Sequence, residues 1–225
     1  MTDTSRSSLA AALATQRVLP LFTCTDPAAG MWVLEALHSG GLRIVEFTNR
    51  SAAARDVFAA LVAAARTRLP DLVLGVGTII DRDQAASFHE AGAAFIVAPH
   101  TDEAVGGFCR ERDLLWCPGA GTVTEMVRAH HLGAAVIKVF PADTLGGPAF
   151  IRAVRGPCPW LSLMPSGGVK LDETNLAEWF AAGVHCVGMG SSLVDAATVA
   201  AGRFDEIAAR ARRLVETLAR IPRSA

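Results

Sequence analysis

The chain has 225 residues, of which 51% are hydrophobic and 19% are charged, and its formal net charge is −1. This composition is typical of a globular protein with a large core, and the charge gives no reason to expect nucleic acid or a membrane as a partner. No apolar run approaches the roughly 20 residues that span a bilayer. Residues 1–8 are polar and lack the apolar centre of a signal peptide, so we expect a cytoplasmic protein.

Short apolar runs alternate with helical patterns along the chain. The short apolar runs predict strands at residues 17–22, 43–47, 72–75, 95–98, 114–117, 136–140, 161–164 and 186–189. Apolar spacing near 3.6 residues predicts helices at 9–15, 29–38, 52–66, 83–91, 102–112, 123–132, 147–154, 173–182 and 204–218. Thr122 and Asp172 are placed to cap helix N-termini, and four glycine positions are placed to end helices: Gly40-Gly41, Gly92, Gly133 and Gly183.

This alternation of strands and helices predicts the fold class. It implies a parallel sheet with right-handed crossovers. Eight such units in about 200 residues predict an α/β protein, a (β/α)8 TIM barrel with an extra N-terminal helix. We expect a single domain over residues 1–225, with the barrel proper at 17–193 and a C-terminal helix at 204–218. A doubly wound open sheet is the alternative, and the absence of Gly-x-Gly-x-x-Gly after the first strand weakens it.

One lysine interrupts an apolar strand. Only two of the 21 basic residues are lysines, and Lys170 lies in a polar loop, whereas Lys138 lies within the predicted strand 136–140. A buried isolated charge costs several kcal/mol unless it is paired or neutralised, and a buried amine without its proton is a nucleophile. Lys138 is therefore a candidate for covalent catalysis on a carbonyl substrate. The alternative is an edge-strand lysine that extends to water.

Polar groups near the ends of other predicted strands can complete such a site, because TIM barrels carry their active sites at the C-terminal strand ends. Glu46 can balance the ammonium and move protons if it faces the barrel interior, or it can form a structural ion pair. Arg50 can hold a substrate carboxylate with its bidentate guanidinium, or it can be a surface arginine. The Thr78 hydroxyl can contact a ligand, or Thr78 can be a turn residue.

Glycine-containing segments follow the last two predicted strands. Gly167-Gly168 lies after the seventh strand and Gly190-Ser191 after the eighth. Their backbone amides and the serine hydroxyl are suited to an anion, and barrels frequently bind phosphate with these two loops. Tight turns that need positive φ are the alternative.

The cysteines and histidines give no sign of a disulfide framework or a metal site. The five cysteines are an odd number and include no Cys-x-x-Cys motif. This usage agrees with a reducing compartment. No spacing of histidine, cysteine and carboxylate resembles a zinc site, so we expect no bound metal.

Five stretches, in order along the chain, together resemble the KDPG/KHG aldolases. They are Val45-Glu46-Phe47-Thr48-Asn49-Arg50, Gly75-Val76-Gly77-Thr78, Pro118-Gly119, Ile137-Lys138-Val139-Phe140-Pro141-Ala142 and Pro165-Ser166-Gly167-Gly168-Val169. These are class I aldolases that act on 2-keto-3-deoxy-6-phosphogluconate (KDPG) and 4-hydroxy-2-oxoglutarate (KHG). The resemblance extends over about residues 17–194, which is most of the chain.

The resemblance implies a barrel that usually assembles as a homotrimer and needs no metal or other cofactor. It implies that Lys138 forms a Schiff base and that Glu46 moves protons. The implied binding residues are Arg50 and Thr78 for the pyruvate part, Pro99 and Phe140 for the pocket wall, Ser166 beside the substrate, and Gly167, Gly168, Gly190 and Ser191 for the phosphate. The phosphogluconate enzymes often have threonine at the position of Ser166. Serine keeps the hydroxyl but loses a methyl contact, which bears on substrate stereochemistry.

The resemblance therefore predicts a class I aldolase that releases pyruvate. Its expected substrates are a phosphorylated 2-keto-3-deoxy sugar acid, which also yields glyceraldehyde 3-phosphate, and KHG, which also yields glyoxylate. The galactonate epimer of KDPG is an alternative substrate. A phosphosugar isomerase or epimerase and a non-catalytic ligand-binding barrel are alternative functions. His100 follows Pro99 and is expected to be exposed.

Overall fold

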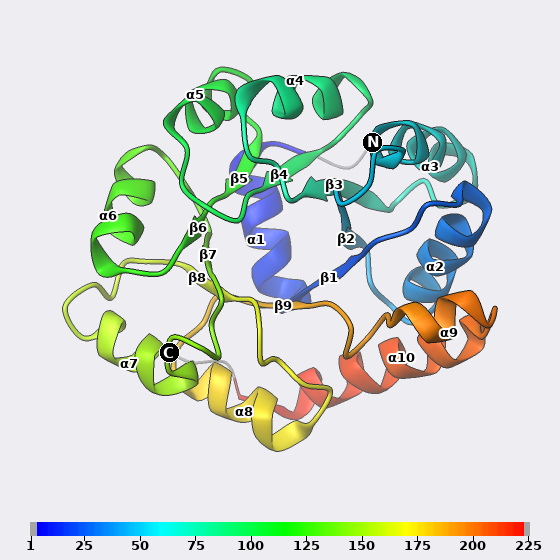
Figure 1. The fold of residues 1–225 in the computed structure, drawn as a ribbon. Helices are drawn as coiled ribbons and strands as arrows, with labels where there is room; N and C mark the ends of the chain where they lie inside the picture. The colour runs from blue at the N-terminus through cyan, green and yellow to red at the C-terminus, as the bar shows by residue number, and fades with distance from the viewer. Residues whose placement is uncertain (1–3, 223–225) are drawn as a thin grey trace.

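In the computed structural model, parallel strands form a ring that helices surround (Figure 1). The structure describes residues 4–222, so parts of the polar segment 1–8 and of the expected domain 1–225 lie outside the described residues. The strands are β1 Val18–Phe22, β2 Ile44–Thr48, β3 Val73–Gly77, β4 Phe95–Val97, β5 Leu115–Cys117, β6 Gly119–Ala120, β7 Ile137–Val139, β8 Leu163–Pro165 and β9 Val187–Met189. Each strand expected from the sequence overlaps one of these.

The strands close into a barrel. Parallel pairing joins them in the orders β5-β4-β3-β2-β1-β9 and β6-β7-β8. A bridge between Ser166 and Gly188 connects β8 to β9. Only Pro118 separates β5 from β6, and proline has no N–H to donate to a ladder. The fifth barrel strand is therefore interrupted at Pro118, and the TIM barrel expected from the sequence is confirmed.

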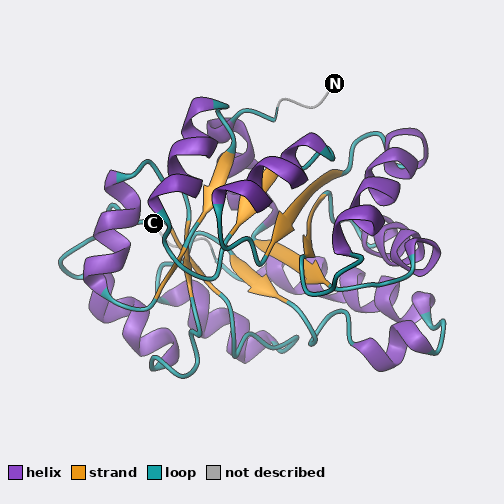
Figure 2. Cartoon of the chain, turned by 45° about the horizontal axis from the view of Figure 1, so that its top comes forward, coloured by secondary structure: helices purple, strands orange, loops and turns teal. Residues whose placement is uncertain are grey.

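Helix α1 Arg6–Gln16 precedes the first strand, and the other helices lie around the outside of the ring (Figure 2). They are α2 Pro27–Ser39, α3 Ala54–Arg68, α4 Arg82–Glu90, α5 Glu103–Glu111, α6 Val123–His131, α7 Gly147–Arg155, α8 Glu173–Ala181, α9 Ala196–Ala200 and α10 Phe204–Arg220. Helix α9 was not expected, because its five residues are too few to show a helical period. None of the helices within residues 4–222 is long and apolar enough to cross a membrane.

The expected helix ends are also present. The Thr122 side chain accepts a hydrogen bond from the Glu125 N–H, and the Asp172 side chain accepts one from the Asn175 N–H. Positive φ angles of 96°, 102°, 97° and 88° occur at the helix-ending glycines Gly41, Gly92, Gly133 and Gly183. The local signals in the sequence therefore place most helix termini within a residue or two.

Helix α1 closes the barrel at the N-terminal ends of its strands. Leu9 and Leu13 pack against interior residues near the starts of the strands, among them Leu19, Ile44 and Val73. In Figure 1, α1 lies across the centre of the ring. Because one end is filled by apolar side chains, polar groups inside the barrel lie toward the C-terminal strand ends.

Candidate active site

Lys138 and Glu46 both lie inside the barrel. Lys138 is on β7 between Gly119 and Met164 of the neighbouring strands, and Glu46 is on β2 between Leu21 and Gly75. Their exposed fractions are 5% and 1%. Side chains alternate between the two faces of a strand, so each of these residues shares the interior face with its second neighbours. The edge-strand alternative for Lys138 is therefore wrong.

The Glu46 carboxyl is buried without a hydrogen bond. Neither of its oxygens has a partner among the described residues, and no ion pair within 4.0 Å links it to Lys138 there. Burial raises its pKa, and the positive charges of Lys138 and then Arg50 oppose this increase. A carboxyl with a raised pKa is suited to accept a proton and to return it.

An aromatic ring borders the lysine, and a proline lies against the neighbouring strand. The Lys138 Nζ lies 5.0 Å from the centroid of the Phe140 ring, which is 39% exposed and so borders solvent. Pro99 lies against Gly119, the strand neighbour of Lys138: a Cβ at Gly119 would overlap the Pro99 carbonyl. The structure therefore brings Phe140 to the amine and Pro99 to the neighbouring strand, while His100 is exposed, as expected.

Arg50 and Thr78 lie together beyond the ends of β2 and β3. The Arg50 Nε donates to the Thr78 Oγ1 at 3.4 Å. Thr78 has a φ of 63°, which is unusual for a β-branched residue and costs on the order of 1–3 kcal/mol. The backbone bond from Ile79 N to Val97 O, at 3.2 Å, holds the next residue in place. Both Arg50 and Thr78 follow the C-terminal ends of their strands, and Arg50 is exposed there.

Ser166 ties the lysine strand to the first glycine loop. Its N–H donates to Val139 O at 3.0 Å, and its carbonyl accepts from Ala142 N at 3.0 Å. A Cβ at Gly188 would lie 3.2 Å from the Ser166 Oγ, so the serine side chain occupies the space beside β9. The side chain is 8% exposed and close in sequence to both glycines of the loop.

The two glycine loops lie side by side and are braced by residues that sequence reasoning did not select. Gly167 and Gly168 have φ angles of 103° and 72°, which favour glycine. The Asn175 Nδ2 donates to Gly168 O at 3.4 Å. The Ser192 Oγ donates to Val169 O at 3.0 Å, which joins the two loops. Ser191 is exposed and Gly190 half-buried beside Leu21.

Asp143 also packs against the first glycine loop. Its Cβ would lie 2.5 Å from a Cβ at Gly168, and its Oδ1 would lie 2.9 Å from one at Gly167. No local pattern predicts this contact or the one from Ser192, because each joins different loops of the barrel, whereas Asn175 lies on the helix that follows the first glycine loop.

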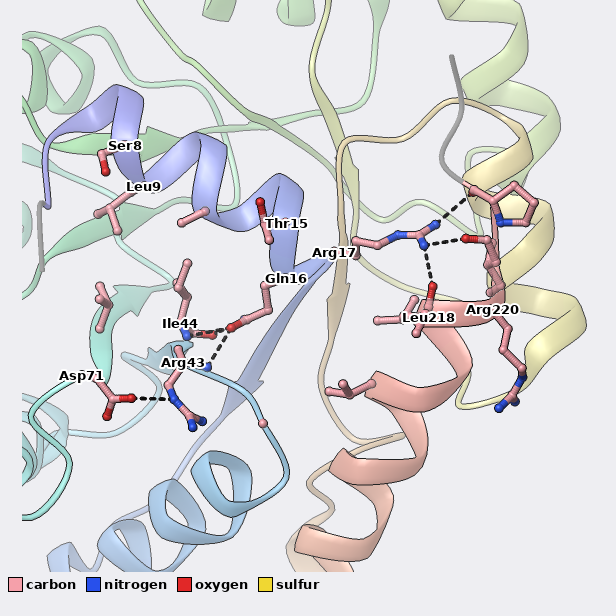
Figure 3. A pocket seen from close by; sticks show the side chains of 17 residues that line it. Ser8, Leu9, Thr15, Gln16, Arg17, Arg43, Ile44, Asp71, Leu218 and Arg220 are labelled. Carbon is pink, nitrogen blue, oxygen red and sulfur yellow. Dashed lines mark hydrogen bonds and ion pairs between the residues drawn. The ribbon is translucent and has the colours of Figure 1, made fainter.

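A pocket of about 900 Å³ lies elsewhere, at the opposite end of the strands (Figure 3). It is bounded by α1, α10 and the N-terminal ends of β2 and β3. Several of its polar side chains are already paired: Arg43 pairs with Asp71 at 2.7 Å, and Gln16 binds both the N–H and the C=O of Ile44. We therefore locate the candidate active site at the C-terminal strand ends. Within residues 4–222 no group of three or more His, Cys, Asp and Glu side chains could hold a metal ion.

Comparison with known proteins decides the family. A family model described as KDPG and KHG aldolase matches residues 9–210. The chain belongs to this family. The 2-dehydro-3-deoxy-phosphogluconate aldolase of Treponema pallidum is 34% identical over 205 residues, which cover 91% of this chain and 95% of that protein. The KHG/KDPG aldolase of Escherichia coli K12 is 31% identical over 212 residues, with 94% and 96% covered.

A solved structure of a family member agrees with the fold. It is a crystal structure of the KDPG aldolase of Legionella pneumophila, with pyruvate captured at low pH as a covalent carbinolamine intermediate. It has a TM-score of 0.83 and 26% sequence identity, and the match covers 91% of this chain and 97% of that one. The barrel, the resemblance to KDPG/KHG aldolases and the assignment to class I aldolases, which are lyases, are therefore confirmed.

Proposed function

We propose that the chain cleaves KDPG to pyruvate and glyceraldehyde 3-phosphate, and KHG to pyruvate and glyoxylate. The observation that carries the proposal is the buried amine of Lys138 inside a barrel that also encloses the Glu46 carboxyl. The names of the relatives from T. pallidum and E. coli support these two substrates. An isomerase or epimerase would need no amine that forms an adduct.

The cleavage needs an electron sink and a proton acceptor. The Lys138 amine adds to the C2 ketone to give a carbinolamine, which loses water to become an iminium. Glu46, directly or through a water molecule, accepts the proton of the C4 hydroxyl. The C3–C4 bond then breaks, and its electron pair moves into the iminium to form an enamine while the aldehyde leaves. Protonation at C3 and hydrolysis release pyruvate and restore the free amine.

The surrounding groups fit the two ends of the substrate. Arg50, hydrogen-bonded to Thr78, is suited to the carboxylate of the pyruvate part. Gly167, Gly168, Gly190 and Ser191 are suited to the phosphate, and Ser166 lies between the lysine strand and this end. Pro99 and Phe140 enclose the carbon chain. The homotrimer implied by the sequence resemblance stays a prediction.

Borohydride reduction in the presence of pyruvate tests the proposal. The expected product is a reduced pyruvate adduct on the Lys138 peptide, with Lys170 as an internal control that stays unmodified. Lys138→Arg keeps the positive charge near Glu46 but removes the nucleophile, so it should fold, form no adduct and release no pyruvate. Comparison of kcat/KM for KDPG, its galactonate epimer and KHG then ranks the substrates. A folded wild-type protein without the adduct would contradict the proposal.

A further inference from the structure

Gly77 lies beside the buried acid. It is the last residue of β3 and pairs with Thr48 of β2, two residues beyond Glu46. A Cβ built at Gly77 would lie 2.5 Å from the Cδ and 2.9 Å from the Cγ of Glu46, and closer still to Oε1. Real Cβ atoms do not approach other heavy atoms this closely. The Glu46 carboxyl therefore occupies the space that any side chain at position 77 would fill.

Packing against neighbouring atoms holds the Glu46 carboxyl in position. Neither oxygen of Glu46 has a hydrogen-bond partner among the described residues, although the residue is only 1% exposed. Because no described residue bonds to these oxygens, the protein itself holds the carboxyl by van der Waals contacts. The contact with the bare Cα of Gly77 is one of them, and it lies on the reacting end of the side chain.

The other interior glycine of β3 has a different neighbour. A Cβ at Gly75 would lie 2.5 Å from Cδ1 of the Phe95 ring and would disturb the apolar interior of the barrel. Gly75 and Gly77 are two residues apart on the same face of one strand. Gly75 therefore makes room for the Phe95 ring, whereas Gly77 makes room for the Glu46 carboxyl.

We propose that Gly77 is a positioning residue whose missing side chain forms the slot that holds the Glu46 carboxyl inside the barrel. The proposal rests on the proposed function, because it assigns Glu46 the proton transfer of the aldol cleavage. Gly77 itself has no group that could transfer a proton, so it acts through Glu46. It acts by keeping the carboxyl where the charge of Lys138 reaches it.

Gly77→Ala is the direct test. Gly77 has no positive φ, so its backbone accepts alanine, and the methyl group meets only the carboxyl end of the Glu46 side chain among its nearest atoms. We expect kcat for cleavage to fall by about 10²–10⁴-fold, the range for loss of a positioned acid–base group. The borohydride-trapped pyruvate adduct on Lys138 should still form. Gly107→Ala is the matched control, because its Cβ meets nothing within 4 Å, and it should keep wild-type kcat.

A double-mutant cycle separates positioning from general damage. In a Glu46→Ala background the slot is vacated, so Gly77→Ala should change neither the residual cleavage rate nor the melting temperature. If Gly77→Ala alone proves unstable, Glu46→Ala/Gly77→Ala should restore both the melting temperature and the adduct. Wild-type kcat in Gly77→Ala, or an equal loss in both backgrounds, would overturn the proposal. Absence of pyruvate release and adduct in the wild type would instead overturn the proposed function.

Discussion

Replacing Glu46 by glutamine should lower activity and raise stability at the same time. The amide keeps the shape of the side chain but cannot carry a proton between intermediates. General acid–base catalysis contributes about 10²–10⁴ in rate, which corresponds to about 2.7–5.5 kcal/mol of activation free energy. We therefore expect kcat for cleavage to fall by this factor in Glu46→Gln, while the trapped adduct on Lys138 persists.

The gain in stability follows from the burial of the carboxyl. Burial raises the pKa of Glu46 in the folded protein, and the charges of Lys138 and Arg50 offset this only in part. A carboxyl with a raised pKa contributes most to stability below its unfolded pKa of about 4.3, and this contribution is lost as pH rises through its folded pKa. Glutamine does not titrate. The unfolding free energy of Glu46→Gln relative to wild type should therefore increase as pH rises from 4 to 8.

Thermal unfolding between pH 4 and pH 8 measures this effect. A gain of about 1 kcal/mol would raise the melting temperature of a chain of this size by roughly 2–4 °C. Glu178→Gln, at an exposed position on α8, controls for the loss of one negative charge. If Glu46→Gln were less stable than wild type at pH 7, attraction between Glu46 and Lys138 would outweigh the cost of burial, and the reasoning would be wrong.

Two further predictions concern stability away from the site. Arg17 is 7% exposed and donates to the carbonyls of Leu218 and Ile221 at 2.5 and 2.7 Å. Arg17→Met should therefore lower the unfolding free energy, measured by urea titration, by about 3 kcal/mol. A loss below about 1 kcal/mol would contradict this. Hydrogen bonds from Thr198 and Arg210 lower the pKa of Asp195. Asp195→Asn should therefore be less stable than wild type at pH 7, and the unfolding free energies of the two proteins should converge as pH falls below about 4.

Much of the fold could be predicted from local patterns. Strand and helix segments follow from periods of two and 3.6 residues, and helix ends follow from residues such as Thr122 and Gly41. Helix α9 could not be predicted in this way, because its five residues show no period. The change of pairing partner at Pro118, from β4 before it to β7 after it, could not be predicted either, because strand pairing joins distant segments.

The sequence by itself determined which reactive groups are available. Lys138 lies in one apolar strand, Glu46 and Arg50 lie near the end of another strand, and glycines follow the last two strands. Alternation along a strand also determined that Lys138 and Phe140 share a face. Only the tertiary structure decided that this face is the interior, and that Thr48 pairs with Gly77 so that the Glu46 carboxyl rests in the space at Gly77. The physical reason is that register and barrel closure are set by contacts between distant segments, which no local pattern contains.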